Sequence, residues 1–330
     1  MDAKNLEKLK AEMERLGFSD TLTGRMEEKM AANEPRFILY DKLESDKGRV
    51  ELALHFNQSR SSEFYYFNKF DVVIEVQPPL MAGEKYFVAS QRQGKEPSLR
   101  EFEMAWLAVK EFRASMPGAE DTRRSAQLYA GTELASSKQL ASHVDGQIIE
   151  LDKGFYKTLM TPAPGQTVYL EKGTGFTLSQ TLNLLSGRSV YREDMLNIQK
   201  NEYSAWVKLE LDSKDKGGNF PMKTFTHGYG YDLSAVLDRF EFKELANPQW
   251  RAELEATLKN GDRGVVNVDI DGKATKLLVE AVPEFKQLNL YSLEGKSIRR
   301  EQHQKAEPLA EVSLGKGKVA KKDKDQELSV

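Results

Sequence analysis

The stretch Gly165–Leu211, GQTVYLEKGTGFTLSQTLNLLSGRSVYREDMLNIQKNEYSAWVKLEL, contains the clearest helix signal and the clearest strand signal of the chain. Thr177 and Gln180 have the spacing of a capping box, in which each side chain bonds a free N–H group at the start of a helix. Leucines at helical spacing follow, and Gly187 stands where a left-handed residue commonly ends a helix. The pattern therefore predicts a short amphipathic helix over residues 177–186.

A predicted strand pair follows this helix. Apolar and polar side chains alternate over residues 203–211, and a period of two is typical of a strand with one buried face. The next segment, Lys216–Asn219, reads KGGN and predicts a turn into a second strand over residues 220–227.

Side chains of this strand pair form the first candidate binding site. They lie on the face opposite the alternating apolar residues and combine aromatic rings with amines: Trp206, Lys208, Lys223 and Phe225. Aromatic rings among basic side chains form the kind of surface on which bases of single-stranded nucleic acid stack. In the alternative interpretation, a helix over residues 233–240 covers this face and Trp206 belongs to the core. Charge is nearly balanced between Gly187 and Thr226, with seven Lys or Arg against six Asp or Glu, whereas a nucleic-acid groove is usually more positive.

The C-terminal tail supplies a second candidate site. Its lysines are crowded together: Lys316, Lys318, Lys321 and Lys322, with Lys324 beyond them. Flexible basic arms contact phosphates without sequence preference. A lysine-rich end also serves as a solubilising tail, and the sequence leaves both interpretations open.

Several segments of the chain resemble segments of a known domain family and of the domain that often precedes it. They read LEKLKAEMERLGF (6–18), HFNQSRSSEFYYFNKFDVVI (55–74), GFTLSQTLNLLSGRSVY (175–191), NEYSAWVKLEL (201–211), GGNFPMKTF (217–225) with GYGYDL (228–233), FEFKELANPQW (240–250) and EAVPEFKQLNLY (280–291). From residue 175 onward they resemble an uncharacterised domain family encoded on conjugative mobile elements of gut bacteria, versions of which also occur attached to type IA topoisomerases. The two N-terminal segments resemble the domain that often precedes it, and residues 79–160 do not align with either domain.

The resemblance implies a mobile-element setting and, through its topoisomerase-linked members, a nucleic-acid context. It supplies no catalytic residues. Single-stranded nucleic acid and a topoisomerase-like protein are therefore the two expected partners.

The length of 330 residues favours two domains over one. We expect two α+β domains with mainly antiparallel sheets packed by short helices. The predicted organisation is an N-terminal domain over 1–116, a partly helical connector over 117–164, a C-terminal domain over 165–297 and a disordered basic and polar tail over 298–330. The connector is assigned because hydrophobic periodicity weakens there, although such a long segment is uncommon inside a compact domain.

Local signals place the elements within each domain. We expect two helices and then three strands at the N-terminus, over residues 6–16, 22–30, 36–42, 49–57 and 64–76. Residues 85–91 are candidates for a fourth strand, and a capping box from Ser98 to Glu101 predicts a helix that reaches Phe112.

Further signals lie in the C-terminal domain. Asp232 and Asn247 are predicted helix caps, and Asp271–Gly272 is a hairpin turn signal. Residues 285–291 are expected to form the last strand.

Composition argues against metal and cofactor sites. The chain has no cysteine, which excludes disulfides and thiolate-based sites. Its histidines stand far apart in the sequence, and a metal site needs converging ligands. A run that imitates a calcium loop begins at Asn267, but Leu278 stands where the loop needs a bidentate glutamate. We therefore expect no metal and no cofactor.

Hydropathy and charge set the expected surroundings of the protein. No apolar run is long enough for a membrane-spanning helix, and the charged N-terminus MDAKNLEKLKAEMERL is unlike a signal peptide. A cytoplasmic protein without membrane contact is expected. A net charge of −3 argues against strong non-specific DNA binding by the whole molecule, while local patches can still bind.

Two functional hypotheses follow. The first is a non-enzymatic accessory protein of a mobile genetic element that binds nucleic acid or a nucleic-acid-handling protein. The second is a protein–protein interaction module that recruits or counters a host factor through a sheet face or edge. An enzyme is disfavoured because the sequence displays no nucleophile–base or metal constellation.

Overall fold

The computed structural model describes residues 2–45, 48–74, 80–81, 83–116, 123–161, 163–171, 173–197, 199–215, 218–270 and 272–305. Over these residues the chain forms four separate sheets, and every strand pair in them is antiparallel. Short helices pack on the sheets, so the predicted α+β class is confirmed. No helix within these ranges is long and apolar enough to cross a membrane.

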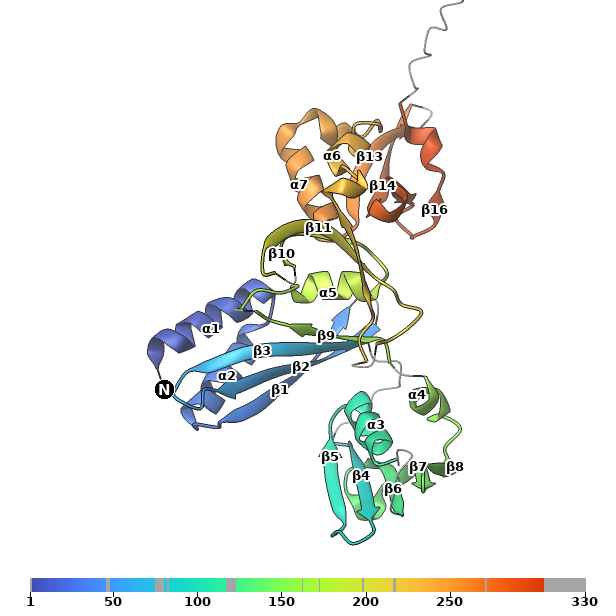
Figure 1. Cartoon of the computed structure of the whole chain (residues 1–330). Helices are drawn as coiled ribbons and strands as arrows, with labels where there is room; N and C mark the ends of the chain where they lie inside the picture. The colour runs from blue at the N-terminus through green and yellow to red at the C-terminus, as the bar shows by residue number, and fades with distance from the viewer. Residues whose placement is uncertain are drawn as a thin grey trace, which may run out of the picture.

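The first sheet has the strand order β1-β2-β3-β9 and carries α1 (Ala3–Leu16) and α2 (Asp20–Ala31) on one face (Figure 1). Its strands are β1 (Arg36–Ser45), β2 (Gly48–Gln58), β3 (Tyr65–Ile74) and β9 (Gly165–Tyr169). The two predicted helices and the first three predicted strands are thus confirmed, with small shifts at their ends. Gly17 ends α1 at a φ of 88°, which favours glycine.

The core of this first unit lies between the sheet and its helices. Leu9 and Met13 of α1 are buried there, as are Leu22 and Met26 of α2. The Phe56 ring stacks between those of Phe37 and Phe67, with centroids 4.9 and 4.7 Å away. Side chains of these strands alternate between this core and the other face, except in β3, where an irregular register places both Phe67 and Phe70 in the core.

A second unit is inserted in the chain between β3 and β9. Its five-stranded sheet has the order β5-β4-β6-β7-β8 and packs on α3 (Ala105–Ala114) and α4 (Tyr156–Met160). The strands are β4 (Lys85–Arg92), β5 (Ser98–Phe102), β6 (Arg124–Gly131), β7 (Lys138–Val144) and β8 (Gln147–Leu151). This unit has a core of its own and lies near one end of the first sheet (Figure 1). We call residues 80–161 the inserted domain.

The inserted domain differs from the predicted organisation. Residues 85–92 pair with β5 and β6, and not with the first sheet, and residues 124–151 contribute three strands where a connector was expected. Residues on both sides of the predicted boundary at 116 therefore share one sheet and one core. These residues were assigned partly to the N-terminal domain and partly to the connector. The strands β6, β7 and β8 are short and rich in small and polar residues, so they lack the alternation that signals a strand. Residues 117–122 and 162 lie outside the described residues.

The capping box predicted at Ser98 is wrong. Ser98–Phe102 is the edge strand β5, and α3 begins only at Ala105. Leu99, which fits the helical spacing, is exposed, whereas Phe112 is buried in the core. Pairing with β4 holds Ser98 and its neighbours in an extended backbone, which a capping box cannot adopt.

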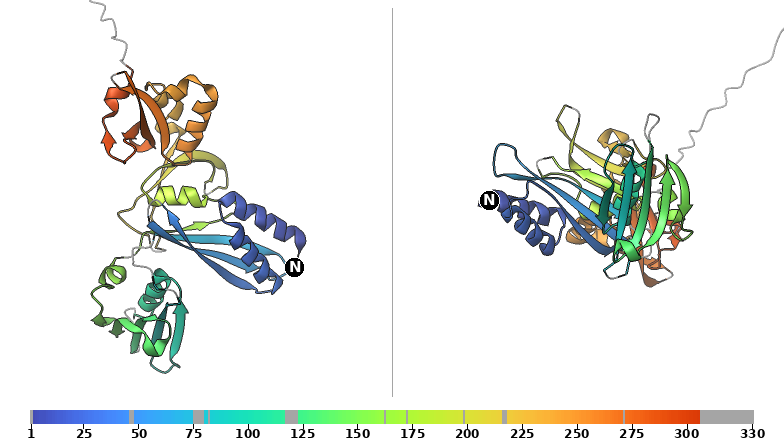
Figure 2. Two further views of the ribbon diagram at one scale, coloured as in Figure 1. Left: turned by 180° about the vertical axis from the view of Figure 1, so that it is seen from behind. Right: turned by 90° about the horizontal axis from the view of Figure 1, so that it is seen from below.

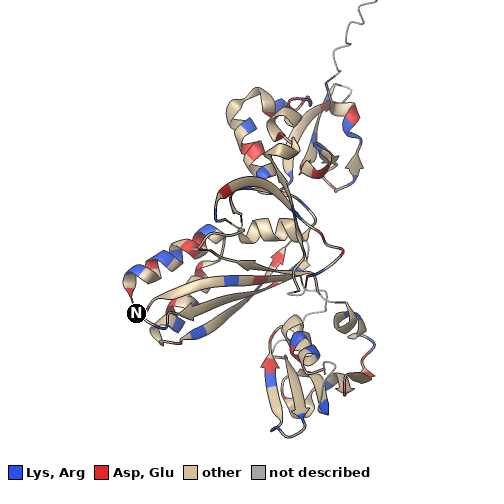
Figure 3. Ribbon diagram, viewed as in Figure 1, with Lys and Arg blue, Asp and Glu red and all other residues tan. Residues whose placement is uncertain are grey.

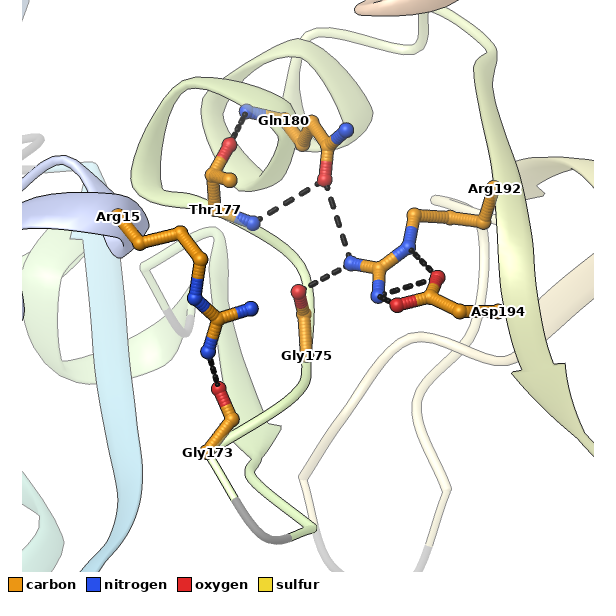
Figure 4. Close-up of polar contacts among 7 residues, drawn as sticks. All are labelled: Arg15, Gly173, Gly175, Thr177, Gln180, Arg192 and Asp194. Carbon is orange, nitrogen blue, oxygen red and sulfur yellow. Dashed lines mark hydrogen bonds and ion pairs between the residues drawn. The ribbon is translucent and has the colours of Figure 1, made fainter. Parts of the chain in front are cut away.

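Residues 165–211 connect the first sheet to the rest of the molecule. They contain β9, α5 (Leu178–Leu185), β10 (Val190–Leu196) and β11 (Glu202–Leu209). The predicted capping box is present, because Gln180 N donates to Thr177 Oγ1 and Thr177 N donates to Gln180 Oε1, both at 3.1 Å (Figure 4). Strand β10 was not indicated by the sequence.

Two guanidinium groups anchor the loop between β9 and α5 (Figure 4). Arg192 on β10 donates to both carboxylate oxygens of Asp194 at 2.7 Å, and it also donates to the Gly175 carbonyl. Arg15, in the last turn of α1, donates to the Gly173 carbonyl of the same loop. These bonds give the Gly173 and Gly175 carbonyl groups partners from outside the loop.

The C-terminal unit has the strand order β13-β14-β15-β16 and the helices α6 (Leu233–Leu237) and α7 (Pro248–Lys259). Its strands are β13 (Gly264–Ile270), β14 (Lys273–Val282), β15 (Gln287–Tyr291) and β16 (Ser297–Ile298). The predicted caps Asp232 and Asn247 accept backbone N–H groups, and Ile270 faces Lys273 across the predicted hairpin. The described residues also contain short 3-10 helices at Leu134–Ser136, His227–Tyr229, Lys243–Ala246, Pro283–Phe285 and Arg300–His303.

The ordered chain extends beyond the predicted start of the tail at residue 298. His303 is buried, and Gln304 forms a bridge with Phe240. Residues 306–330 lie outside the described residues.

Strand β11 joins two cores. It is the central strand of the sheet β10-β11-β12, with β12 at Met222–Thr226. Val207 and Leu209 belong to the core of the first unit, whereas Trp206 belongs to the core of the C-terminal unit. Both faces of β11 are therefore buried, where the alternation predicted one, because the C-terminal unit packs on the second face (Figures 1 and 2).

Candidate functional site

The predicted aromatic–basic patch is not an exposed surface. Trp206 is only 4 % exposed, and its ring lies 5.4 Å from that of Tyr191 and 5.5 Å from that of Tyr231. Phe225, its cross-strand neighbour, is also buried. Neither ring presents a face to a base, so the stacking role predicted for both is wrong. The alternative interpretation, with Trp206 in the core, is confirmed, and α6 contributes to that core.

The two lysines of the predicted patch are held in ion pairs. Lys208 and Lys223 each donate to Glu284 at 2.7 Å. These hydrogen bonds lower the pKa of Glu284 below its ordinary value. The lysines therefore tie β11 and β12 to the segment between β14 and β15. The tail candidates Lys316, Lys318, Lys321 and Lys322 lie outside the described residues, and their role stays a prediction.

The first sheet has a second face, opposite α1 and α2. Cross-strand pairing arranges its side chains in rows. From one end of the strands to the other, the rows are Arg36, Asn57 and Tyr66; Ile38, His55, Lys69 and Tyr169; Tyr40, Ala53, Asp71 and Thr167; and Lys42, Glu51, Val73 and Gly165. The last row lies under α3 of the inserted domain. We call the first two rows the open face.

Exposed tyrosines and basic groups characterise the open face. Tyr169 is 68 % exposed, and Lys69 Nζ lies 5.6 Å from the centroid of its ring. Tyr66 is exposed on the neighbouring strand β3. Arg36 is exposed on β1 and donates to Asn57 Oδ1 at 3.0 Å. The composition expected around Trp206 is thus found at other residues, on a different sheet.

Nearby acidic groups are paired with cations or with a histidine. Asp71 contacts His55, and Glu171, beyond the end of β9, pairs with Lys200 at 2.9 Å. Figure 3 shows basic and acidic residues interspersed over the whole ribbon. Any preference for an anionic ligand therefore comes from the local arrangement of side chains and not from the net charge.

A buried carboxylate, Asp71, organises the middle of the second face. It shares a hydrogen bond of 2.6 Å with His55 Nε2 and accepts another of 2.5 Å from Thr167 Oγ1. Burial alone would raise the pKa of Asp71, but these hydrogen bonds outweigh burial and lower it. Because His55 on β2 and Thr167 on β9 both contact the carboxylate of Asp71 on β3, this arrangement ties the three strands together.

A cavity of about 360 Å³ lies between the last row of the second face and α3. Val73 and Gly165 form part of its floor, Trp106 and Val109 of α3 part of its roof, and Thr158 of α4 part of its wall. Ligand pockets in proteins start at about 300 Å³ and are mostly apolar with a few polar groups. The cavity has both properties, and we refer to it as the α3 cavity.

A serine–histidine pair in the inserted domain was not indicated by the sequence. Ser115 Oγ lies 2.8 Å from Nε2 of the buried His143 and also donates to the Phe112 carbonyl at 2.5 Å. Because the hydroxyl proton goes to Phe112, the histidine is the donor of this pair and not a base. Ser115 also caps the C-terminus of α3, where the helix dipole disfavours a developing anion. We interpret the pair as structural.

Among the residues that the structure describes, no group of three or more His, Asp or Glu side chains is arranged to hold a metal ion. Comparison of the chain with known protein families, curated proteins and solved structures finds no match.

The hydrogen bonds of Asp71 predict a loss of stability in acid. Since its pKa is lowered in the folded protein, their contribution is fully present above the pKa of the unfolded chain and is lost as pH falls through the folded pKa. Asp71→Asn should cost about 1.5–3 kcal/mol at neutral pH and should weaken the acid dependence of the unfolding free energy. Urea unfolding from neutral to acid pH measures both effects. Asp212→Asn, at an exposed position, is the control, and equal acid dependence in the two variants would contradict the assignment.

Proposed function

We propose that this protein is a non-enzymatic binding protein that holds single-stranded nucleic acid across the open face of its first sheet. The observation that carries the proposal is Tyr169, whose exposed ring lies beside the Lys69 ammonium. Bases of single strands stack on exposed aromatic rings, and a sheet can present several rings on one surface.

The neighbours of Tyr169 support the same interpretation. Tyr66 offers a second exposed ring in the adjacent row. Lys69 and Arg36 supply cations for phosphates, and Asn57 supplies an amide for polar contacts. The Asp71 hydrogen bonds fix the strands on which these groups stand, so the surface is ordered before a ligand arrives.

The biological setting is proposed from the family resemblance. We place the protein as an accessory factor of a mobile genetic element that acts on single strands or beside a nucleic-acid-handling enzyme. A protein partner that docks on the open face is the alternative, and nucleic-acid binding assays separate the two.

Tyr169→Ala should weaken binding of a labelled single-stranded oligonucleotide by about 5- to 150-fold, equivalent to about 1–3 kcal/mol for one stacked base. Fluorescence anisotropy at low salt measures the change. The matched control is Tyr156→Ala, which removes a similarly exposed tyrosine from the inserted domain and should leave the affinity unchanged.

Lys69→Gln should act on the salt dependence. The slope of log affinity against log salt should fall by about one unit, because one phosphate contact is removed. The proposal would be contradicted if the unaltered protein did not bind the oligonucleotide at low salt, or if Tyr169→Ala and Tyr156→Ala lost equal affinity. A protein partner on the open face would then be favoured.

A further inference from the structure

We propose that the α3 cavity is a nucleotide pocket, which takes one nucleotide of the strand that lies on the open face. The inference rests on the proposed function, because it names where part of the same ligand goes. It adds a second, enclosed site with its own recognition groups.

The walls of the α3 cavity suit a flat heteroaromatic ring. Val73 of β3 and Val109 of α3 line it, and the Trp106 ring lies 5.9 Å from Nζ of the solvent-exposed Lys110. Gly165 keeps the floor free of a side chain, since a Cβ there would meet Val73 Cγ2 at 2.8 Å. An apolar slot of this kind accepts the faces of a base, while polar groups must meet its edge.

Two residues that line the cavity, Thr158 and Trp106, each carry a buried polar atom of this kind. Thr158 is 7 % exposed, and its Oγ1 has no hydrogen-bond partner among the described residues. Trp106 Nε1 is buried and also has no partner in this part of the chain. Unpaired buried polar atoms are destabilising and rare in folded proteins. A base edge that accepts from Trp106 and bonds to the Thr158 hydroxyl would satisfy both atoms.

The α3 cavity also has basic side chains in its lining and lies close to the open face. Lys110, Arg113 and Lys214 line the cavity and supply positive charge for a phosphate. Arg113 also donates to the Leu159 carbonyl and Lys214 to the Ala163 carbonyl, so Lys110 is the cation that a phosphate can approach without breaking either bond. The carboxylates of the floor already have partners, because Asp71 shares a hydrogen bond with His55 and Glu51 lies 3.6 Å from Lys42. Thr167 lines the cavity two residues before Tyr169 on β9, about 6.6 Å along the strand, so one ligand can reach both sites.

The test is calorimetric titration of the full chain with adenosine and uridine 5′-monophosphates, with the free nucleosides and inorganic phosphate as separate arms. We expect saturable binding of at least one monophosphate, weaker binding of its nucleoside and weakest binding of phosphate. Phosphate binding as tight as that of the nucleotides, or no nucleotide binding at millimolar concentration, would overturn the pocket.

Two conservative variants locate the binding. Thr158→Val removes the hydroxyl at equal size, and Trp106→Phe removes the indole N–H; each should weaken nucleotide binding about tenfold, the effect of one lost hydrogen bond in a buried site. The melting temperature of Thr158→Val should stay equal or rise, because an unpaired buried hydroxyl is removed. Thr226→Val, at an exposed position, is the control. Unchanged nucleotide affinity in both variants would overturn the inference.

The two proposals fail separately. If Tyr169→Ala weakens oligonucleotide binding but no mononucleotide binds, the open face stands and the pocket is wrong. If Thr158→Val weakens mononucleotide binding but Tyr169→Ala leaves oligonucleotide affinity unchanged, the nucleotide pocket is supported and the proposed binding at the open face is wrong.

Discussion

Replacing Trp206 with alanine should destabilise the protein by about 3–5 kcal/mol, the usual cost of truncating a large buried aromatic side chain. Trp206 stands on the central strand β11 and packs between Tyr191 and Tyr231 in the core of the C-terminal unit. Its loss would leave a cavity at the contact between β10–β12 and that unit. Because domains are typically stable by only about 5–15 kcal/mol, the C-terminal unit should unfold well before the rest of the chain.

Urea unfolding monitored by circular dichroism measures the total cost, and hydrogen exchange locates it. The matched control is Trp250→Ala on α7, where the tryptophan is 54 % exposed and the change should stay within about 0.5–1 kcal/mol. Equal stability losses in the two variants would show that Trp206 is not the core residue that its contacts indicate.

The local elements of the fold could be predicted because their signals are short-range. The stripe around Leu9 and Met13, the box at Thr177 and Gln180, and the cap at Asn247 each involve residues within one or two helical turns. A backbone that satisfies its own N–H groups locally needs no information from distant residues.

The sequence left two interpretations of Trp206 open, an exposed ring and a core residue, because its surroundings depend on distant segments. Alternation along β11 separates its two faces, but it does not say whether the second face meets water or another unit. Only the packing of α6 and the sheet β13-β14-β15-β16 decides this, and those elements come later in the chain. The same packing accounts for the pairing of Lys208 and Lys223 with Glu284.

The open face was missed because its rows combine distant segments. Tyr169 meets Lys69 only because β9 pairs with β3, and the whole inserted domain separates those strands in the sequence. Tyr66 and Lys69 lie on a strand that was predicted, yet the face to which each belongs depends on the irregular register between β2 and β3. The α3 cavity needs both the sheet and the inserted domain, so no single segment of sequence contains it.

Phe112→Ala should unfold the inserted domain while leaving the other two units folded. Phe112 is fully buried on α3 and its ring lies 5.1 Å from that of His143, inside a core that shares no residue with the cores of the other units. Truncation should again cost about 3–5 kcal/mol, and here the loss falls on one small domain.

Limited proteolysis and hydrogen exchange measure where this loss falls. We expect cleavage and rapid exchange within residues 80–161, while β1–β3 and the C-terminal unit stay protected, because few contacts carry the change across the junction. Phe285→Ala, at an exposed phenylalanine, should leave exchange unchanged throughout. The same Phe112→Ala protein should lose mononucleotide binding in the α3 cavity but keep oligonucleotide binding that depends on Tyr169. Uniform loss of protection over all three units would instead mean that the three fold as one cooperative unit.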